Sequence, residues 1–216
     1  MSPRPYHLGK RREPVEAARR QVLDAARHLL GGTASYTAFT VEAVARQADV
    51  ARATVYYQFG SKAGLLEALC DYLADIGGMS GLAEAFTEPD PRQALHRFVA
   101  SFGRFWAADR PAMRRLRALA QLDPDVGAVI AARDQRRRDG LAVLTGRLAA
   151  DGKLAGGADG QLAGSPADAA GLDHLVRVLT VLTSFETFDG LAGPDQEITA
   201  AVADVLRLAE AALRLG

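Results

Sequence analysis

The sequence predicts an all-α protein with a helix-turn-helix domain at its N-terminus and a larger helical domain after it. Apolar residues recur at helical spacing along nearly the whole chain, and the alternating pattern of half-buried strands does not occur. Within the first 62 residues, two short predicted helices joined by a tight turn follow a longer one, which is the order of a helix-turn-helix unit. With 216 residues, 49% of them hydrophobic, the chain can bury a sizeable core.

Four helices are predicted in the N-terminal third, over residues 14–30, 41–48, 51–58 and 61–76. The glycine pair at 31–32 ends the first of them. Thr40 and Ser61 are suitable N-caps for the second and the fourth, because a hydroxyl can accept a hydrogen bond from the unpaired N–H groups of a first turn. The tight turn contains Asp49, a residue type that tolerates a left-handed backbone better than most.

The rest of the chain reads as further helices after a broken region at 77–91. These helices are predicted from residue 92 onward, over 111–122, over 124–152 and, after a glycine-rich loop, over about 167–189 and 194–215. We therefore expect three parts: a flexible basic arm over residues 1–13, a helix-turn-helix domain over 14–62, and a helical domain over 63–216.

Charge is unevenly distributed, although the formal net charge is zero. Residues 1–62 hold ten Lys and Arg against five Asp and Glu, whereas the remainder holds 16 against 21. A basic N-terminal third is what a phosphate-binding surface requires. Chance clustering of arginines at a terminus is the alternative interpretation.

The third predicted helix presents polar groups outward. If Val55 points inward, a rotation of about 100° per residue brings Phe59 inward as well. The other positions then carry a guanidinium, a hydroxyl and two phenols, which can reach base edges and phosphates in a major groove. The residues expected at DNA are Thr40, Arg52, Ala53, Thr54, Tyr56, Tyr57 and Lys62.

The stretch "FTVEAVARQADVARATVYYQFGSKAGLLEAL", residues 39–69, resembles the TetR family of bacterial transcriptional regulators. Its most specific part is "TVYYQFGSK" followed by a leucine-rich helix, and with the preceding "AARHLLGG" the resemblance covers about residues 15–75. Two positions depart from the family's pattern, since Asp49 stands where glycine is usual and Ala51 where a serine or threonine cap is common. The bare helix-turn-helix pattern alone would fit a pair of core helices in a bundle equally well.

The resemblance implies that the helical domain binds a small molecule and forms a homodimer. The ligand-binding candidates are large apolar side chains of the middle and late helices: Phe98, Phe102, Phe105, Trp106, Met113, Leu116, Phe185 and Phe188. The interface candidates belong to the two final helices, which are apolar on most sides and must be buried by something: Leu175, Leu179, Leu182, Ile198, Val202, Val205 and Ala209. The alternatives are a filled core and burial within one chain.

Enzymatic chemistry finds little support in the sequence. The four histidines are widely scattered, a single cysteine allows no zinc-binding spacing, and no nucleophile elbow, P-loop or dinucleotide fingerprint occurs. We expect no catalytic residues, metal or cofactor, and a helical enzyme remains a remote alternative. Most arginines of "RDQRRRDG", residues 133–140, are expected on solvated faces or in ion pairs.

The sequence contains neither a secretory signal nor an apolar run long enough for a membrane span, and the lone Cys70 fits a reducing compartment. We expect a cytoplasmic repressor that binds a (pseudo)palindromic operator in double-stranded DNA as a homodimer. A small hydrophobic or amphipathic molecule would release it. The alternatives are a regulator without an effector, and one that activates or needs a corepressor.

Overall fold

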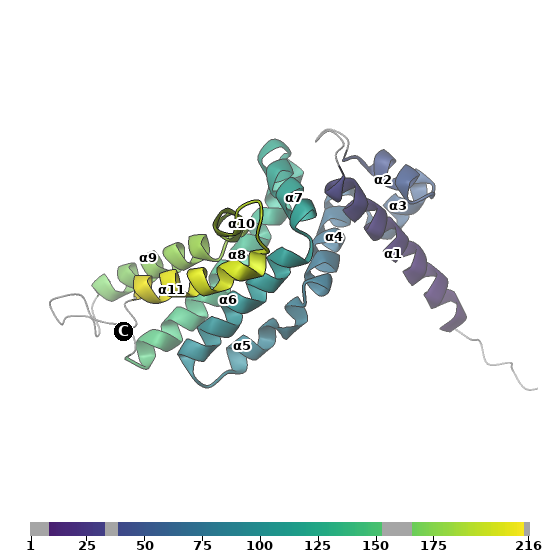
Figure 1. Ribbon diagram of the computed structural model, residues 1–216. Helices are drawn as coiled ribbons and strands as arrows, with labels where there is room; N and C mark the ends of the chain where they lie inside the picture. The colour runs from purple at the N-terminus through teal and green to yellow at the C-terminus, as the bar shows by residue number, and fades with distance from the viewer. Residues whose placement is uncertain (1–8, 33–38, 153–165, 214–216) are drawn as a thin grey trace, which may run out of the picture. The chain divides into compact units, whose positions relative to one another are not determined.

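The computed structural model describes residues 9–32, 39–152 and 166–213, and all regular secondary structure in these residues is helical (Figure 1). The elements are α1 (Gly9–Gly31), α2 (Val41–Gln47), α3 (Arg52–Phe59), α4 (Lys62–Ile76), the 3₁₀ turn η2 (Met79–Leu82), α5 (Ala83–Thr87), α6 (Pro91–Ala108), α7 (Arg110–Leu122), α8 (Pro124–Ala150), α9 (Pro166–Leu182), α10 (Phe185–Ala192), the 3₁₀ turn η3 (Ile198–Ala201) and α11 (Val202–Leu213). The predicted all-α class is confirmed.

The chain divides into two compact units. The first contains residues 1–72 and 114–129, and the second contains residues 73–113 and 130–216. The domain division expected at residue 62 stays a prediction. Of the expected arm over 1–13, residues 1–8 lie outside the described part of the chain, whereas the backbone of 9–13 is already helical in α1.

The first unit is built on α1, which packs against α2, while α2 packs against α3. Aliphatic side chains from all four N-terminal helices are almost completely buried in its core: Val22, Ala26, Leu30, Val44, Val55, Leu65, Leu66 and Leu69. Burial of each large aliphatic side chain favours the folded state by about 1.5–3 kcal/mol. This core fixes which face of α3 is left for solvent.

The turn between α2 and α3 is a helix C-cap with a left-handed residue. Asp49 adopts φ 51°, the N–H of Val50 donates to the carbonyl of Ala45 (3.0 Å), and the N–H of Asp49 donates to that of Arg46 (3.2 Å). These two bonds form the Schellman arrangement that usually has glycine at the left-handed position. The expectation that aspartate can take this position is confirmed.

The junction between α3 and α4 is equally tight. The Oγ of Ser61 accepts from the N–H of Gly64 (3.0 Å), so Ser61 caps α4 as predicted. A Cβ at Gly64 would lie 2.1 Å from the carbonyl oxygen of Phe59, a distance that excludes any side chain there. The start of α4 is therefore held directly against the end of α3.

The second unit contains the long helices α6, α8, α9 and α11, with α11 packed against both α6 and α9 (Figure 1). Gly103 permits a close approach on α6, because a Cβ there would lie 2.5 Å from a methyl of Val202 and 3.2 Å from the ring of Phe188. Two elements were not predicted, since η2 and α5 occupy part of the region expected to be broken.

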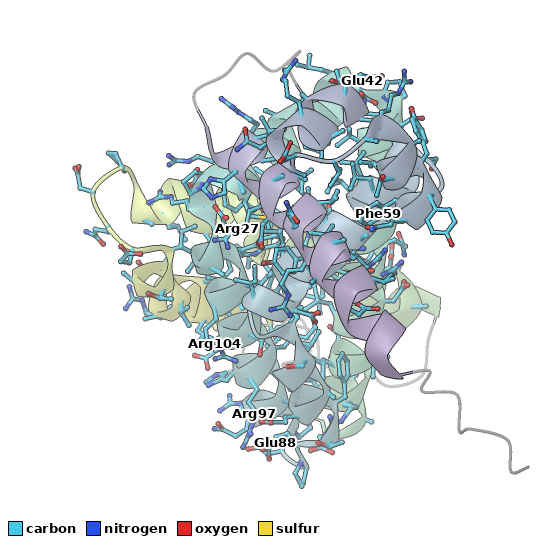
Figure 2. The ribbon with its side chains drawn as sticks, turned by 90° about the vertical axis from the view of Figure 1, so that its right-hand side faces the viewer. Arg27, Glu42, Phe59, Glu88, Arg97 and Arg104 are labelled. Atoms are coloured by element: carbon cyan, nitrogen blue, oxygen red, sulfur yellow. The ribbon has the colours of Figure 1, made fainter. Side chains whose placement is uncertain are left out.

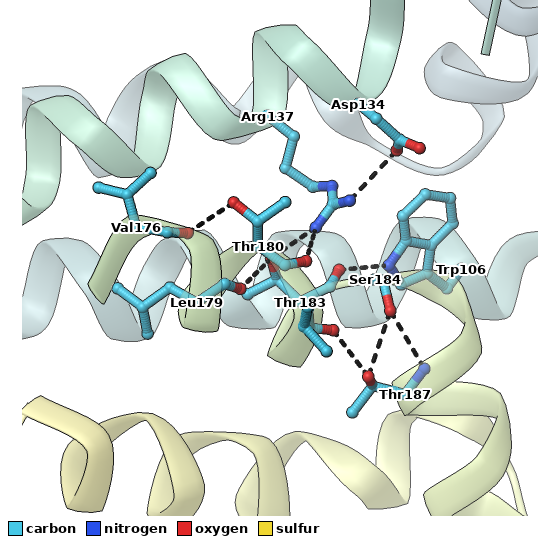
Figure 3. Close-up of polar contacts among 10 residues, drawn as sticks. Trp106, Asp134, Arg137, Val176, Leu179, Thr180, Thr183, Ser184 and Thr187 are labelled. Carbon is cyan, nitrogen blue, oxygen red and sulfur yellow. Dashed lines mark hydrogen bonds and ion pairs between the residues drawn. The ribbon is translucent and has the colours of Figure 1, made fainter. Parts of the chain in front are cut away.

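The predicted single helix over 167–189 is wrong, because the chain breaks after Leu182 and restarts as α10 with Ser184 as its N-cap. Arg137 of α8 reaches this break (Figure 3). Its Nη1 donates to the carbonyl of Thr180 and to the hydroxyl of Thr183 (2.8 Å), and the indole N–H of Trp106 donates to the carbonyl of Thr183 (3.1 Å). Side chains from two other helices thus satisfy carbonyls that the helix end leaves unpaired.

The last helix also begins later than the predicted 194, since η3 precedes α11 and α11 starts at Val202. Arg137 of α8 belongs to the arginines expected on solvated faces or in ion pairs, and it forms an ion pair with Asp134 (3.2 Å). Its side chain is nevertheless only 4% exposed, and it also donates to the carbonyl of Thr180 at the end of α9.

Candidate nucleic-acid interface

The exposed face of α3 carries the two tyrosines. Tyr57 is 89% exposed and Tyr56 38%, while Val55 and Phe59 of the same helix are buried. Ala53 is exposed and Thr54 is half-buried, and contacts of these two residues with DNA remain predictions. One face of α3 thus anchors the helix, and the other presents two phenols to solvent.

Side chains of α1 hold the turn before α3 and the last turn of α3. The amide of Gln21 donates to the carbonyl of Ala48 in the turn (2.7 Å), and the guanidinium of Arg19 donates to the carbonyl of Gln58 (3.3 Å). The same guanidinium stacks 4.5 Å from the ring centroid of Phe59. Figure 2 shows Phe59 beside α1 in the first unit. The exposed face of α3 therefore belongs to a rigidly supported helix.

Arg52, the first residue of α3, is held from two sides. Its Nε lies 2.8 Å from Oε1 of Glu42 on α2, and its Nη2 donates to the Tyr56 hydroxyl (3.2 Å). The guanidinium carbon also lies 5.2 Å from the Tyr56 ring centroid. The bond to Tyr56 and then the charge of Glu42 raise the pKa of Arg52 above its ordinary value. Arg52 stays cationic at any pH at which duplex DNA exists.

Thr40 lies at the start of α2, where it was expected. Its hydroxyl oxygen accepts from the N–H of Ala43 (3.1 Å), so the residue caps the helix. The side chain is exposed, and its own O–H can still donate outward. A contact between Thr40 and DNA remains a prediction.

Lys62 has a partner that the sequence did not indicate. Its Nζ donates to Oδ2 of Asp123, which lies between α7 and α8. The other oxygen of Asp123 accepts from the N–H groups of Asp125 (3.0 Å) and Val126 (3.4 Å), so the same carboxylate caps α8. The hydrogen bond from Lys62 is the main reason why the pKa of Asp123 is lowered. An ammonium has three donors, so a phosphate can share Lys62 with Asp123.

The aromatic residues expected at a ligand site lie together in the second unit. Ring centroids are separated by 4.8 Å between Phe98 and Phe102, 4.5 Å between Phe105 and Trp106, and 5.8 Å between Trp106 and Phe185. Phe105 is half-buried, and the other four rings are buried. Rings this close are in contact with one another.

The remaining ligand candidates divide between the units. Phe188 and Met113 are buried in the second unit. Leu116 is also buried, but it belongs to the first unit. A ligand site that includes these residues remains a prediction.

The interface candidates fall into two groups. Leu179, Ile198, Val205 and Ala209 are at most 1% exposed within a single chain. The other candidates are half-buried: Leu175, Leu182 and Val202. A second chain cannot contact the first group without a rearrangement of the core, because their side chains already pack inside their own chain.

Two other apolar residues of these helices are open to solvent, Val181 of α9 (64%) and Leu208 of α11 (45%). The helices α9 and α11 that carry them pack against each other. Helical periodicity found the apolar helices but did not distinguish the side that is buried within the chain from the side that is open to solvent. The interface itself stays a prediction.

Neither a metal site nor a membrane-spanning helix occurs in the part of the chain that the structure describes. In residues 9–32, 39–152 and 166–213, no three His, Cys, Asp or Glu side chains lie close enough to hold a metal ion. None of the helices described combines the length and apolar character that a membrane-spanning helix needs.

Comparison with known proteins shows that part of the chain matches a known protein family. Residues 22–69 match the sequence model of the bacterial regulatory proteins of the tetR family. This range contains the last ten residues of α1, all of α2 and α3, and the first half of α4. No curated protein sequence matches the chain significantly.

Several solved structures share the fold along most of both chains. A TetR-like transcriptional regulator from Rhodococcus sp. RHA1 is 22% identical, with a TM-score of 0.61, covering 91% of this chain and 96% of that one. NalD, the secondary repressor of the MexAB-OprM multidrug efflux pump in Pseudomonas aeruginosa, is 17% identical, with a TM-score of 0.64 and coverage of 92% and 96%. A transcriptional regulator from Saccharomonospora viridis, solved in complex with choline, is 16% identical, with a TM-score of 0.59 and coverage of 90% and 96%.

At these identities the structural likeness concerns the fold, and the match of the helix-turn-helix segment identifies the family. The shared fold and the segment match both agree with the geometry of the first unit, in which α1 supports α3, a short helix whose polar face is exposed. The family predicted from residues 39–69 is confirmed. The chain belongs to the TetR family of bacterial transcriptional regulators, which bind DNA.

Proposed function

We propose that the protein is a repressor that holds its operator as a homodimer, reads it with α3, and releases it when a small hydrophobic or amphipathic molecule binds the second unit. The observation that carries the DNA-reading part is the exposed face of α3. Tyr57 there is 89% exposed and Arg52 is charged, while Gln21 and Arg19 hold the helix from behind. Such groups suit base edges and phosphates.

Tyr57 is the sharpest probe of this face. Because its ring is almost fully exposed, Tyr57→Ala should leave the melting temperature unchanged. If the ring contacts DNA, the variant should bind a selected duplex more weakly, by about 1–3 kcal/mol. Val143→Ala, which truncates an exposed residue of the second unit, is the matched control. Equal DNA affinity of wild type and Tyr57→Ala would argue against α3 as the reading helix.

The homodimer is proposed from symmetry and from exposed apolar residues. A dimer presents two reading helices roughly 34–36 Å apart, one turn of B-DNA, and therefore selects inverted repeats. Val181 and Leu208 give the exposed sides of α9 and α11 apolar surface that a second copy could cover. DNA fragments enriched from a random pool should contain an inverted repeat, and sedimentation of the complex should give two chains per site. A single half-site bound by one chain would oppose the dimer.

Repression and release by a ligand are supported by the fold neighbours and by the aromatic cluster. NalD is named as a repressor, and the Saccharomonospora viridis protein was solved with choline. In this chain the rings around Trp106 are closely packed, so a ligand must separate them in order to bind. The cost of that rearrangement is what would couple binding to a change of shape.

Trp106 reports on the ligand proposal, because it is the only tryptophan. A ligand that enters the cluster should change its fluorescence and raise the melting temperature by mass action. The ligand should weaken operator binding, and the operator should weaken ligand binding by the same factor. A compound library that never alters the fluorescence or the DNA affinity would favour a regulator without an effector. Because bacterial DNA lies in the cytoplasm, the proposal also places the protein there.

A further inference from the structure

The arginine at the start of α3 is oriented by an acidic residue of the other helix of the motif. Glu42 lies in the first turn of α2 (Figure 2), and its Oε1 is 2.8 Å from Nε of Arg52. Both side chains are more than half exposed, so the pair lies at the surface and not in the core. A surface pair of this kind adds little to stability. The main effect of this ion pair is to fix the direction in which the Arg52 guanidinium points.

The contacts of Arg52 leave one edge of its guanidinium available. The guanidinium is a planar fork with a side edge, which includes Nε, and a tip. Glu42 binds Nε on the side edge, and the Tyr56 hydroxyl accepts one hydrogen bond from Nη2. Among the residues that the structure describes, no group pairs with Nη1. The tip of the fork, formed by Nη1 and the second N–H of Nη2, is the edge that can donate to O6 and N7 of guanine together. Glu42 therefore restrains Arg52 without occupying that edge.

The carboxylate of Glu42 would also repel DNA directly. A negative charge beside the DNA-facing side of α3 is repelled by phosphates whatever the base sequence. A restrained arginine loses less conformational freedom when it binds a base, so the correct sequence is favoured. The same residue thus weakens binding to all sequences and strengthens the preference for one, which is how specificity is commonly gained.

We propose that Glu42 is a positioning residue that sets the base preference of Arg52 and lowers binding to non-operator DNA. This inference rests on the proposed role of Arg52 as a base-reading residue. It names a residue outside α3 as a determinant of operator sequence. Arg52 is charged throughout the range from about pH 6 to 9, which lies well below the ordinary pKa of arginine, so the effect should not vary with pH there.

The test uses the full-length protein and a duplex enriched from a random pool. Dissociation constants are measured for this duplex, for its single-base variants and for a scrambled duplex. Glu42→Ala should reduce the preference for the best base at one position about fivefold or more, and should raise affinity for the scrambled duplex about two- to fivefold. Glu42→Gln keeps an oxygen that can accept from Nε, so it should retain more of the preference than Glu42→Ala while raising scrambled-duplex affinity equally.

Two further variants make the outcomes decisive. Glu197→Ala removes an exposed carboxylate of the second unit and controls for overall charge. Arg52→Ala should lose the preference at the same base position as Glu42→Ala. If Arg52→Ala relaxes one position and Glu42→Ala leaves it intact, the inference about Glu42 is overturned while the role of Arg52 stands. If Arg52→Ala weakens all duplexes equally, the assignment of Arg52 as a reader fails and the inference fails with it.

Discussion

Replacing Asp123 should destabilise the first unit by an amount that follows from its contacts. One oxygen caps α8 through the N–H groups of Asp125 and Val126, and the other binds the Nζ of Lys62. Asp123→Ala removes both interactions. The lost cap costs about 1 kcal/mol and the partly buried ion pair about 0.5–1 kcal/mol, so the free energy of unfolding should fall by about 1.5–2 kcal/mol.

Asp123→Asn separates the two interactions. Its amide oxygen can still cap α8, whereas the charge that attracts Lys62 is gone, so only about 0.5–1 kcal/mol should be lost. Lys62→Met should cost a similar amount, and adding it to Asp123→Asn should cost little more. For a chain of this length, thermal denaturation should show a midpoint about 3–8 °C lower for Asp123→Ala and about 1–4 °C lower for Asp123→Asn.

The contribution of the Lys62–Asp123 ion pair to stability should decrease as the pH falls. Because the pKa of Asp123 is lowered in the folded state, the ion pair stabilises the protein above the unfolded carboxyl pKa of about 3.9. This contribution is lost as the pH falls through the lower pKa of the folded state. The difference in stability between wild type and Asp123→Asn should be constant from about pH 5 to 7 and shrink below about pH 4. Equal stability at pH 7, or a difference that persists in acid, would refute the reasoning.

Three further substitutions test other interactions of the two units. Arg137→Met removes the donors to Thr180 and Thr183 at the end of α9, and urea denaturation should show a loss of about 2–3 kcal/mol; a neutral result would mean that the helix end needs no partner. Leu208→Glu places a charge on exposed α11 and should give monomers in sedimentation without lowering the melting temperature, whereas an intact dimer would place the interface elsewhere. Lys62→Ala should reduce the slope of log affinity against log salt by about one unit, and an unchanged slope would mean that Lys62 contacts only Asp123.

Local sequence signals predicted the first unit well, because its elements are determined by nearby residues. The hydroxyls of Thr40 and Ser61 cap the helices that follow them, and Asp49 takes the left-handed position in the turn. The inward direction assigned to Val55 correctly placed the tyrosines of α3 outside. Each of these features depends on spacing within a few residues.

Features that depend on distant residues were not predictable from the sequence. Asp123, the partner of Lys62, lies 61 positions away along the chain. Arg137, which donates to the end of α9, belongs to α8 and lies 43 positions before Thr180. The break after Leu182 interrupts an apolar pattern that reads as one helix, because its carbonyls are satisfied by side chains from elsewhere. Periodicity likewise shows that α11 is apolar, but it does not say which side its own chain covers.

The central claim, that the first unit holds duplex DNA through its phosphates as well as its bases, is tested most directly by the salt dependence of binding. Fluorescence anisotropy should be measured with a selected duplex between about 50 and 200 mM monovalent salt. If a dimer makes roughly 6–10 phosphate contacts, the affinity should fall by about 10³–10⁵ over that range. An affinity that does not change with salt, or a protein that enriches no duplex from a random pool, would contradict the account.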